Sequence, residues 1–397
     1  MDQAVRRRRR ALFVFFLLAG VSMSSWVTRT PAIRDRLEVS TGQMGLVLFG
    51  LSLGSMLGIL LSGRLVSRFG TRPVMIWGTA VLISGLATVA LGALASSTPL
   101  VTAGLFLFGT GMGGGEVAMN VDATDVERLS GVTTMPVLHG CFSLGTVLGA
   151  GAGIAATAAD VPVQWHLGVV TVVAVLLLSY AIPAIPAGTG RVDAAAVGES
   201  QGGGTAVWKD RKLLLIGAIV LAMALAEGSA NDWLPLIMVD GHGMGEAAGS
   251  LVYAGFAASM TLGRFGGGYF LDRYGRVVVV RASAVSGGIG LLLVIVADSA
   301  VVAGIAVLLW GLGASLGFPL ALSAAGESGP DETARVSLVA IIGYLAFLVG
   351  PPSLGFLGEH VGLRPAMTVV LAFVACAAFL APAVDVRGRK TEALAGE

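Results

Sequence analysis

The sequence has few charged residues and almost no cysteine. Only 12% of its 397 residues are charged, whereas soluble domains usually carry about 25%. Its two cysteines and four histidines are scattered and match neither a disulfide framework nor a metal-ligand spacing. The net charge of +1 provides no overall basic field for nucleic acid. We therefore expect no cofactor, no metal site and no nucleic-acid partner.

Long apolar segments are what the chain has in abundance. Hydrophobic residues make up 55% of it, and a helix needs about 20 apolar residues to cross the hydrocarbon core of a bilayer. Backbone polar groups in lipid must bond within their own segment, so such segments form helices. We predict an all-α membrane protein with 12 transmembrane helices. They lie near 11–29, 43–62, 73–95, 99–121, 135–158, 165–186, 212–236, 247–269, 277–297, 299–322, 334–357 and 364–384.

Lysine and arginine indicate the orientation of these helices. With the N-terminus inside, the inner segments carry 21 of these residues and the outer segments carry four. This asymmetry predicts a multi-pass protein of the inner (plasma) membrane with both termini in the cytoplasm. The run Arg6–Arg10 before an apolar stretch also fits a cleaved signal peptide. Cleavage, however, would leave an odd number of spans.

The apolar pattern divides the chain into two halves. Residues 187–211 are polar and contain three consecutive glycines, which is typical of a flexible linker. We predict an N-terminal six-helix bundle over 1–186, a cytoplasmic linker over 187–211 and a C-terminal six-helix bundle over 212–397. A short basic loop follows span two and recurs after span eight, 205 residues later. Two matching halves are typical of duplicated transporters, whose substrate site lies where the halves meet.

Both loops resemble the signature loop of the major facilitator superfamily, Gly-x-x-x-Asp-Arg-x-Gly-Arg. The second copy matches at Gly268, Asp272, Arg273, Gly275 and Arg276. The first copy supplies Gly63, Arg68, Gly70 and Arg72 but has Ser67 in place of the acid. The resemblance implies loops that take part in conformational change, with the acid locking neighbouring helix ends. Its loss puts that lock in doubt in the first half. For one copy alone, a merely basic turn is the alternative.

Span four carries a Gly-rich run followed by Glu116 and, one helical turn later, Asn120. This segment is similar to the fucose–proton symporter branch of the superfamily. The resemblance implies that Glu116 lines a cavity and takes part in proton coupling or sugar binding, with Asn120 beside it. The alternative is a carboxylate that stabilises the helix bundle.

Charged groups at membrane depth are costly and therefore mark functional sites. In span seven, Glu227 and Asn231 share a helix face, and Asp232 is turned about 140° from Glu227. Arg29 ends span one, and we expect it to pair with Asp232 or Glu227 at an outer gate. Structural roles for the two acids, and snorkelling of Arg29 to the surface, remain alternatives.

Two further polar side chains are candidates. His139 begins span five and is expected to relay protons, while Tyr344 in span eleven is expected to hydrogen-bond a polar solute. Packing roles are the alternatives for both. Two glycine patterns concern helix packing and helix shape. Gly145, Gly149 and Gly153 form a close-packing stripe. Gly350-Pro351-Pro352 should kink or break span eleven.

The chain has no Walker-type nucleotide loop and no cluster of catalytic side chains. We therefore predict a monomeric secondary transporter, not an enzyme, that symports a small polar solute such as a sugar with protons by alternating access. Drug–proton antiporters of the superfamily often carry Arg in span four, where this chain offers Glu116. An exporter of drugs or metabolites, sodium coupling and a membrane sensor are the alternatives. The segments 25–33, 227–233 and 343–352 also resemble an uncharacterised bacterial subgroup of the superfamily.

Overall fold

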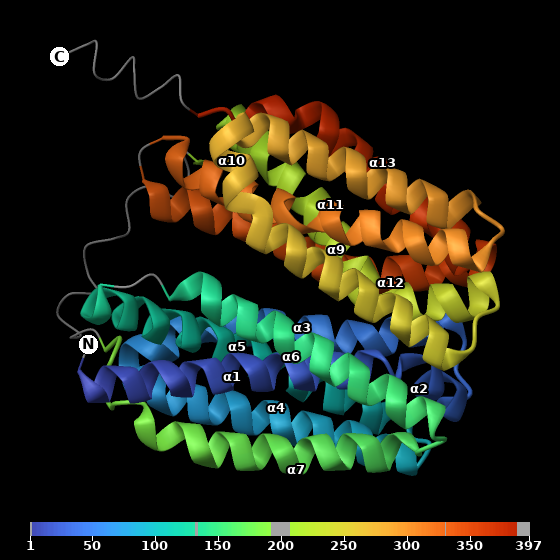
Figure 1. Ribbon diagram of the computed structural model, residues 1–397, viewed down its shortest axis with the longest axis horizontal. Coiled ribbons are helices and arrows are strands. Elements are labelled where there is room, and N and C mark those ends of the chain that lie inside the picture. Colours follow the sequence, from blue (N-terminus) through green and yellow to red (C-terminus); the bar gives the residue numbers. More distant parts are fainter. Residues whose placement is uncertain (1, 132–133, 192–206, 330, 387–397) are drawn as a thin grey trace. The chain divides into compact units, whose positions relative to one another are not determined.

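The computed structural model describes residues 2–131, 134–191, 207–329 and 331–386. This part of the chain is helical and contains no strand (Figure 1). Most of the predicted linker, residues 192–206, lies outside it. The first six long helices are α1 (Gln3–Val27), α3 (Thr41–Phe69), α4 (Thr71–Leu94), α5 (Thr98–Ser130), α6 (Met135–Ala158) and α7 (Val163–Ala181). A short helix, α2 (Thr30–Leu37), follows α1.

Further long helices follow in the second half of the chain. They are α9 (Arg211–His242), α10 (Glu246–Val296), α11 (Ala300–Glu327), α12 (Glu332–Val361) and α13 (Leu363–Leu380). Among the described residues, eleven helices are long and apolar enough to cross a membrane. The chain passes through each predicted apolar segment as a helix, and several helices extend beyond the predicted boundaries.

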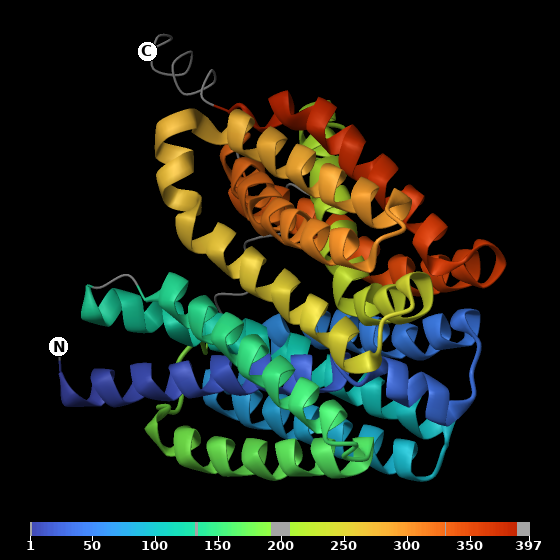
Figure 2. The same cartoon turned by 45° about the vertical axis from the view of Figure 1, so that its right-hand side comes forward.

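Helix α10 accounts for the difference between eleven helices and twelve predicted spans. Its 51 residues would extend about 77 Å at 1.5 Å per residue, more than twice the hydrocarbon thickness. The helix is interrupted at Gly275, whose φ is 77°, and the ribbon turns sharply there in Figure 2. Counted as two spans, α10 confirms the twelve predicted crossings.

The chain forms two compact units. Unit 1 comprises Met1–Glu199 and Gly245–Ala254, and unit 2 comprises Ser200–Met244 and Gly255–Glu397. In unit 1, α5 packs against α3 and α4, and α1 packs against α6 and α7. In unit 2, α9 packs against α11, α12 and α13.

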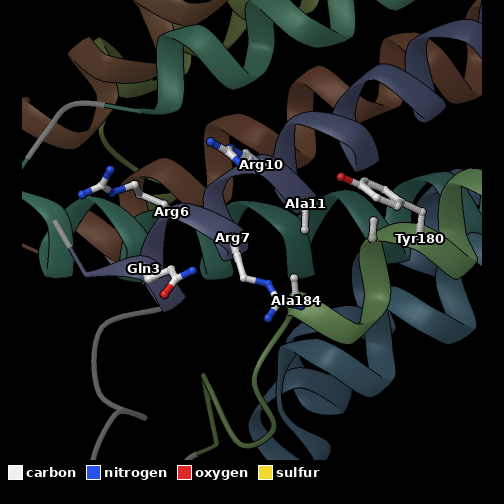
Figure 3. Close-up of a pocket in the computed structure, with 8 residues that line it drawn as sticks. Gln3, Arg6, Arg7, Arg10, Ala11, Tyr180 and Ala184 are labelled. Carbon is white, nitrogen blue, oxygen red and sulfur yellow. The ribbon is translucent and has the colours of Figure 1, made fainter.

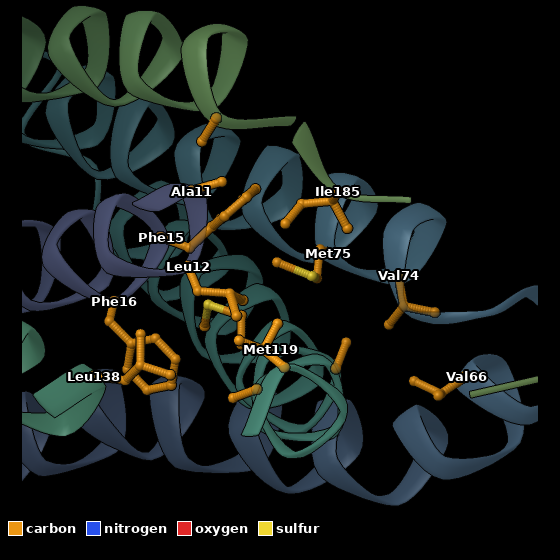
Figure 4. Close-up of a cluster of buried hydrophobic side chains, with 14 residues drawn as sticks. Ala11, Leu12, Phe15, Phe16, Val66, Val74, Met75, Met119, Leu138 and Ile185 are labelled. Carbon is orange, nitrogen blue, oxygen red and sulfur yellow. The ribbon is translucent and has the colours of Figure 1, made fainter. Parts of the chain in front are cut away.

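A buried apolar cluster holds the arginine-rich end of α1 against its neighbours in unit 1 (Figure 4). Leu12, Phe15 and Phe16 of α1 are at most 2% exposed, and Met75 of α4 and Met119 of α5 belong to the same cluster. Each such side chain contributes about 1.5–3 kcal/mol on burial. The position of the basic residues that precede this cluster is therefore fixed by apolar packing.

Close approach of α1 and α6 depends on the predicted glycine stripe. A Cβ on Gly145 would lie 2.3 Å from the carbonyl oxygen of Leu17. A Cβ on Gly149 would lie 2.4 Å from Ser24 Oγ, and one on Gly153 would lie 2.0 Å from Thr28 Oγ1. The backbones can touch only where no side chain intervenes, so the close-packing prediction is confirmed.

Replacing Gly145 by Val should therefore separate α1 from α6 and lower the free energy of unfolding by about 1–3 kcal/mol. Gly151 on the same helix provides the control, because a Cβ there meets nothing within 4 Å. Unfolding titrations in mixed detergent micelles compare the two valine variants. Equal losses of stability would show that the stripe has no special role in packing.

Of the two outcomes predicted for Gly350-Pro351-Pro352, a break of span eleven is not found, and a kink stays a prediction. Helix α12 continues through both prolines to Val361. Proline removes one backbone donor, but neighbouring helices and local adjustments let membrane helices tolerate it.

Candidate functional site

The two signature loops have the same backbone geometry. Gly70, between α3 and α4, has φ 86° and ψ 170°, and Gly275 in α10 has φ 77° and ψ 165°. Residues with a Cβ rarely adopt this conformation, so glycine allows each turn to be made by one residue. The first glycine of each loop is not required for steric reasons, since a Cβ on Gly63 or Gly268 would meet nothing within 4 Å.

A buried ion-pair network lies beside the first turn. Arg8 of α1 donates through Nε and Nη2 to the two carboxylate oxygens of Asp122, over 2.9 and 2.8 Å. Thr71, directly after Gly70, donates to Asp122 Oδ1 over 2.7 Å. Arg8 also pairs with Asp125 at 2.8 Å. Asp122 of α5, whose side chain is completely buried, therefore joins the first turns of α1 to the residue that follows the Gly70 turn.

Unit 2 has an equivalent contact. Arg276, directly after Gly275, pairs with Glu327 at the end of α11 over 2.7 Å. Arg276 and Glu327 follow Thr71 and Asp122 by 205 residues, the spacing of the turn glycines. Each half therefore joins the residue after its turn to an acid at the end of its fourth long span.

The remaining loop residues have more local contacts. The guanidinium groups of Arg68 and Arg273 lie over the rings of Phe69 and Tyr274, 5.2 and 5.7 Å from their centroids. Asp272 is exposed and makes no hydrogen bond or ion pair with any residue that the structure describes. Its expected role as a lock stays a prediction.

The two acids of α9 have different surroundings. Glu227 accepts two hydrogen bonds from Nη2 of Arg264, at 3.0 and 3.2 Å. The lysine and arginine distribution predicted a cytoplasmic position for Arg264. In the structure, Arg264 lies within α10 and pairs with Glu227. Asp232 is 7% exposed and has no hydrogen-bond or ion-pair partner within the described part of the chain. Asn231 beside it and Tyr344 of α12 are partly exposed.

Helix α5 carries the other candidate acid. A Cβ on Gly111 would contact Gly78 and Leu82 of α4, and one on Gly113 would contact Ser55 of α3. These glycines bring α5 against two neighbours. Glu116 is exposed, and Asn120 has a buried Oδ1 without a hydrogen-bond partner among the described residues. The carboxyl group of Glu116 is therefore accessible, whereas the amide oxygen of Asn120 is enclosed.

Arg29 lies at the other end of α1 in unit 1. Only 4% of it is exposed. It donates to Thr157 Oγ1 and to the carbonyl oxygen of Val161, each over 2.7 Å. It also lines a cavity of about 570 Å³ with Glu246. Arg29 and Glu227 each have partners inside their own units, and the expected pairing of Arg29 with an acid of α9 stays a prediction.

His139 contacts an aromatic ring. It is exposed, and its ring lies edge-on to Phe16 with 5.2 Å between centroids. The structure thus places Arg29, Glu116, Asn120 and His139 in unit 1, and Glu227, Asn231, Asp232 and Tyr344 in unit 2.

A comparison of the sequence with known families identifies the chain. The family model described as Major Facilitator Superfamily matches residues 11–351. The chain belongs to the major facilitator superfamily. This MFS chain is 32% identical over 371 residues to an uncharacterized MFS-type transporter of Yersinia pestis, covering 93% of this chain and 94% of that protein. It is therefore a multi-pass membrane transporter of the secondary kind and not an enzyme.

Solved structures agree on the fold. The MFS chain is similar to a D-xylose–proton symporter, with TM-score 0.78, 12% identity and coverage of 96% of this chain and 98% of the other. It is also similar to the E. coli fucose:proton symporter FucP, with TM-score 0.67, 17% identity and coverage of 95% and 98%. At these identities the likeness concerns the fold alone.

Several charged residues of this MFS chain make specific contacts that sequence reasoning missed, among them Arg8, Asp122, Arg264 and Glu327. The 205-residue offset was a usable signal for two of them, because it aligns Asp122 with Glu327. No comparable signal distinguishes Arg8 from the arginines that flank it.

Proposed function

We propose that this MFS transporter moves a small polar solute, with a sugar as first choice, across the inner membrane together with protons. Both termini face the cytoplasm in this proposal, which rests on the distribution of lysine and arginine. Transport proceeds by alternating access. The observation that supports coupling most strongly is the buried carboxyl group of Asp232, which has no partner in the part of the chain that the structure describes.

Asp232 differs from Glu227 although both belong to α9. Glu227 has the guanidinium group of Arg264 as a partner, whereas Asp232 has no partner among the described residues. An isolated carboxylate is costly to bury. The residue can reduce this cost by holding a proton or by binding a donor group of the solute. Either event would make proton binding or solute binding at Asp232 a step of the transport cycle.

Glu116 and Asn120 provide the polar side chains of unit 1 in this proposal. The exposed carboxylate of Glu116 and the buried amide oxygen of Asn120, which accepts no hydrogen bond from the described residues, belong to one face of α5. A carboxylate accepts hydrogen bonds and an amide both donates and accepts them, so together they suit hydroxyl groups. This chemistry suits a polyhydroxylated solute, and the choice between such a solute and a lipophilic cation is left to the counterflow panel below.

Replacing Asp232 by Asn should abolish solute accumulation driven by a pH gradient while leaving solute exchange in place. The amide preserves shape but cannot gain or lose a proton. In sealed proteoliposomes, we expect gradient-driven uptake to fall to the level of protein-free liposomes, because position 232 can no longer bind a proton, and counterflow to stay close to wild type. The control is Glu38→Gln, an exposed acid without a described partner. Unchanged gradient-driven uptake by Asp232→Asn would remove this residue from the coupling.

The solute class is tested by counterflow with a panel of sugars, other polar metabolites and lipophilic cations. We expect exchange with sugars or similar hydroxylated solutes. Responses confined to lipophilic cations would favour an exporter of drugs or metabolites and would refute the symport proposal.

A further inference from the structure

The first turns of α1 and the end of α7 enclose a basic cavity of about 620 Å³ in unit 1 (Figure 3). Arg6, Arg7 and Arg10 line it together with Gln3 and Tyr180, and small alanine side chains form its apolar part. None of the lining residues is acidic. The volume lies within the range of roughly 300–1,000 Å³ that is typical of small-ligand sites.

The arginines of the run 6–10 have different roles. Arg8 points into the protein and is neutralised by Asp122 and Asp125. Arg9 lies over the ring of Phe13, with its guanidinium carbon 5.8 Å from the centroid. Arg7 and Arg10 are exposed and make no hydrogen bond or ion pair with the described residues. The cavity therefore presents two cations whose charge nothing in the described chain balances.

An apolar stripe runs along α7 to this cavity. Val169, Val172, Leu176 and Tyr180 recur at spacings of three or four residues, and each is at least 60% exposed. These residues therefore form one face of the helix. Tyr180 belongs to both features, since it ends the stripe and lines the cavity. Tyrosine is enriched where a membrane helix reaches the polar head groups.

We propose that this cavity binds the phosphate-bearing head group of an anionic phospholipid, whose acyl chains lie along the apolar stripe of α7. Guanidinium groups are suited to phosphate because they offer several donors in a planar fork. Basic pockets at the cytoplasmic ends of membrane helices are suited to such head groups. The arginines would also suit a soluble phosphate, but Tyr180 joins the cavity to the apolar stripe of α7, so a lipid can place its head group and its acyl chains there at the same time.

The test uses the full-length protein in detergent and measures retained lipid by native mass spectrometry. Phosphatidylglycerol is the anionic probe and phosphatidylcholine is the neutral one. We expect wild type to retain phosphatidylglycerol in preference to phosphatidylcholine. The variant Arg7→Gln/Arg10→Gln should bind phosphatidylglycerol about tenfold more weakly or worse, since each removed cation contributes to the attraction. The control Lys209→Gln/Arg211→Gln removes two exposed cations elsewhere and should leave binding unchanged.

Three results would overturn the proposal. They are wild-type affinity in Arg7→Gln/Arg10→Gln, an equal loss in the control, and full displacement of phosphatidylglycerol by millimolar inorganic phosphate, which would indicate a soluble ligand. If the double variant is not monodisperse, the single variants Arg7→Gln and Arg10→Gln decide the question. Each should then show a several-fold loss, and wild-type binding in both would count against the site.

Discussion

Replacing Arg8 by Gln should lower the free energy of unfolding by about 3–5 kcal/mol, because it leaves a buried carboxylate without its cation. The side chain of Asp122 is completely buried and that of Arg8 is only 6% exposed. Thr71 would remain as a donor to Asp122, but a hydroxyl group does not neutralise the charge. Unfolding titrations in mixed detergent micelles measure the loss.

Two further variants make this prediction specific to the buried pair. Arg128→Gln removes the other arginine that pairs with Asp125, but the Arg128 side chain is 79% exposed, so its loss should cost at most about 1 kcal/mol. The double variant Arg8→Gln/Asp122→Asn removes both charges and should recover part of the lost stability. If Arg8→Gln were no worse than Arg128→Gln, the network would not hold α1 against α5.

Replacing Glu227 by Gln should reduce solute transport about tenfold or more, because Arg264 would lose its counter-charge within the helices of unit 2. Arg264→Gln should have a similar effect. The double variant Glu227→Gln/Arg264→Gln should transport solute faster than the product of the two single effects predicts, since a contacting pair is typically coupled by about 0.5–3 kcal/mol. Counterflow in proteoliposomes, corrected for the amount of inserted protein, gives the three rates.

The matched control for this pair is Asp298→Asn. Asp298 pairs with Arg364 in the same unit, but its side chain is fully exposed, so transport should remain close to wild type. Independent effects of Glu227→Gln and Arg264→Gln would show that the contact between them does not matter for transport.

The spans and turns were predictable because their signals are local. An apolar run of about 20 residues needs no information from the rest of the chain. Gly70 and Gly275 were recognisable because both belong to a loop pattern that recurs 205 residues later, and the structure gives both a positive φ. The close-packing role of Gly145, Gly149 and Gly153 followed from their regular spacing.

The charged contacts were not predictable because they depend on the tertiary arrangement. Arg8 lies among four other arginines, and its selection depends on Asp122, 114 residues later in the chain. Arg264 was placed with the cytoplasmic cations because nothing in its own segment indicates that Glu227 lies opposite.

Proton coupling is tested by imposing a proton gradient across sealed proteoliposomes that contain the wild-type protein and an internal pH-sensitive dye. After addition of a solute identified by counterflow, we expect protons and solute to enter together and a protonophore to abolish the solute accumulation. Solute entry at the same rate with and without the gradient, and with no change in internal pH, would contradict proton-coupled transport by this chain.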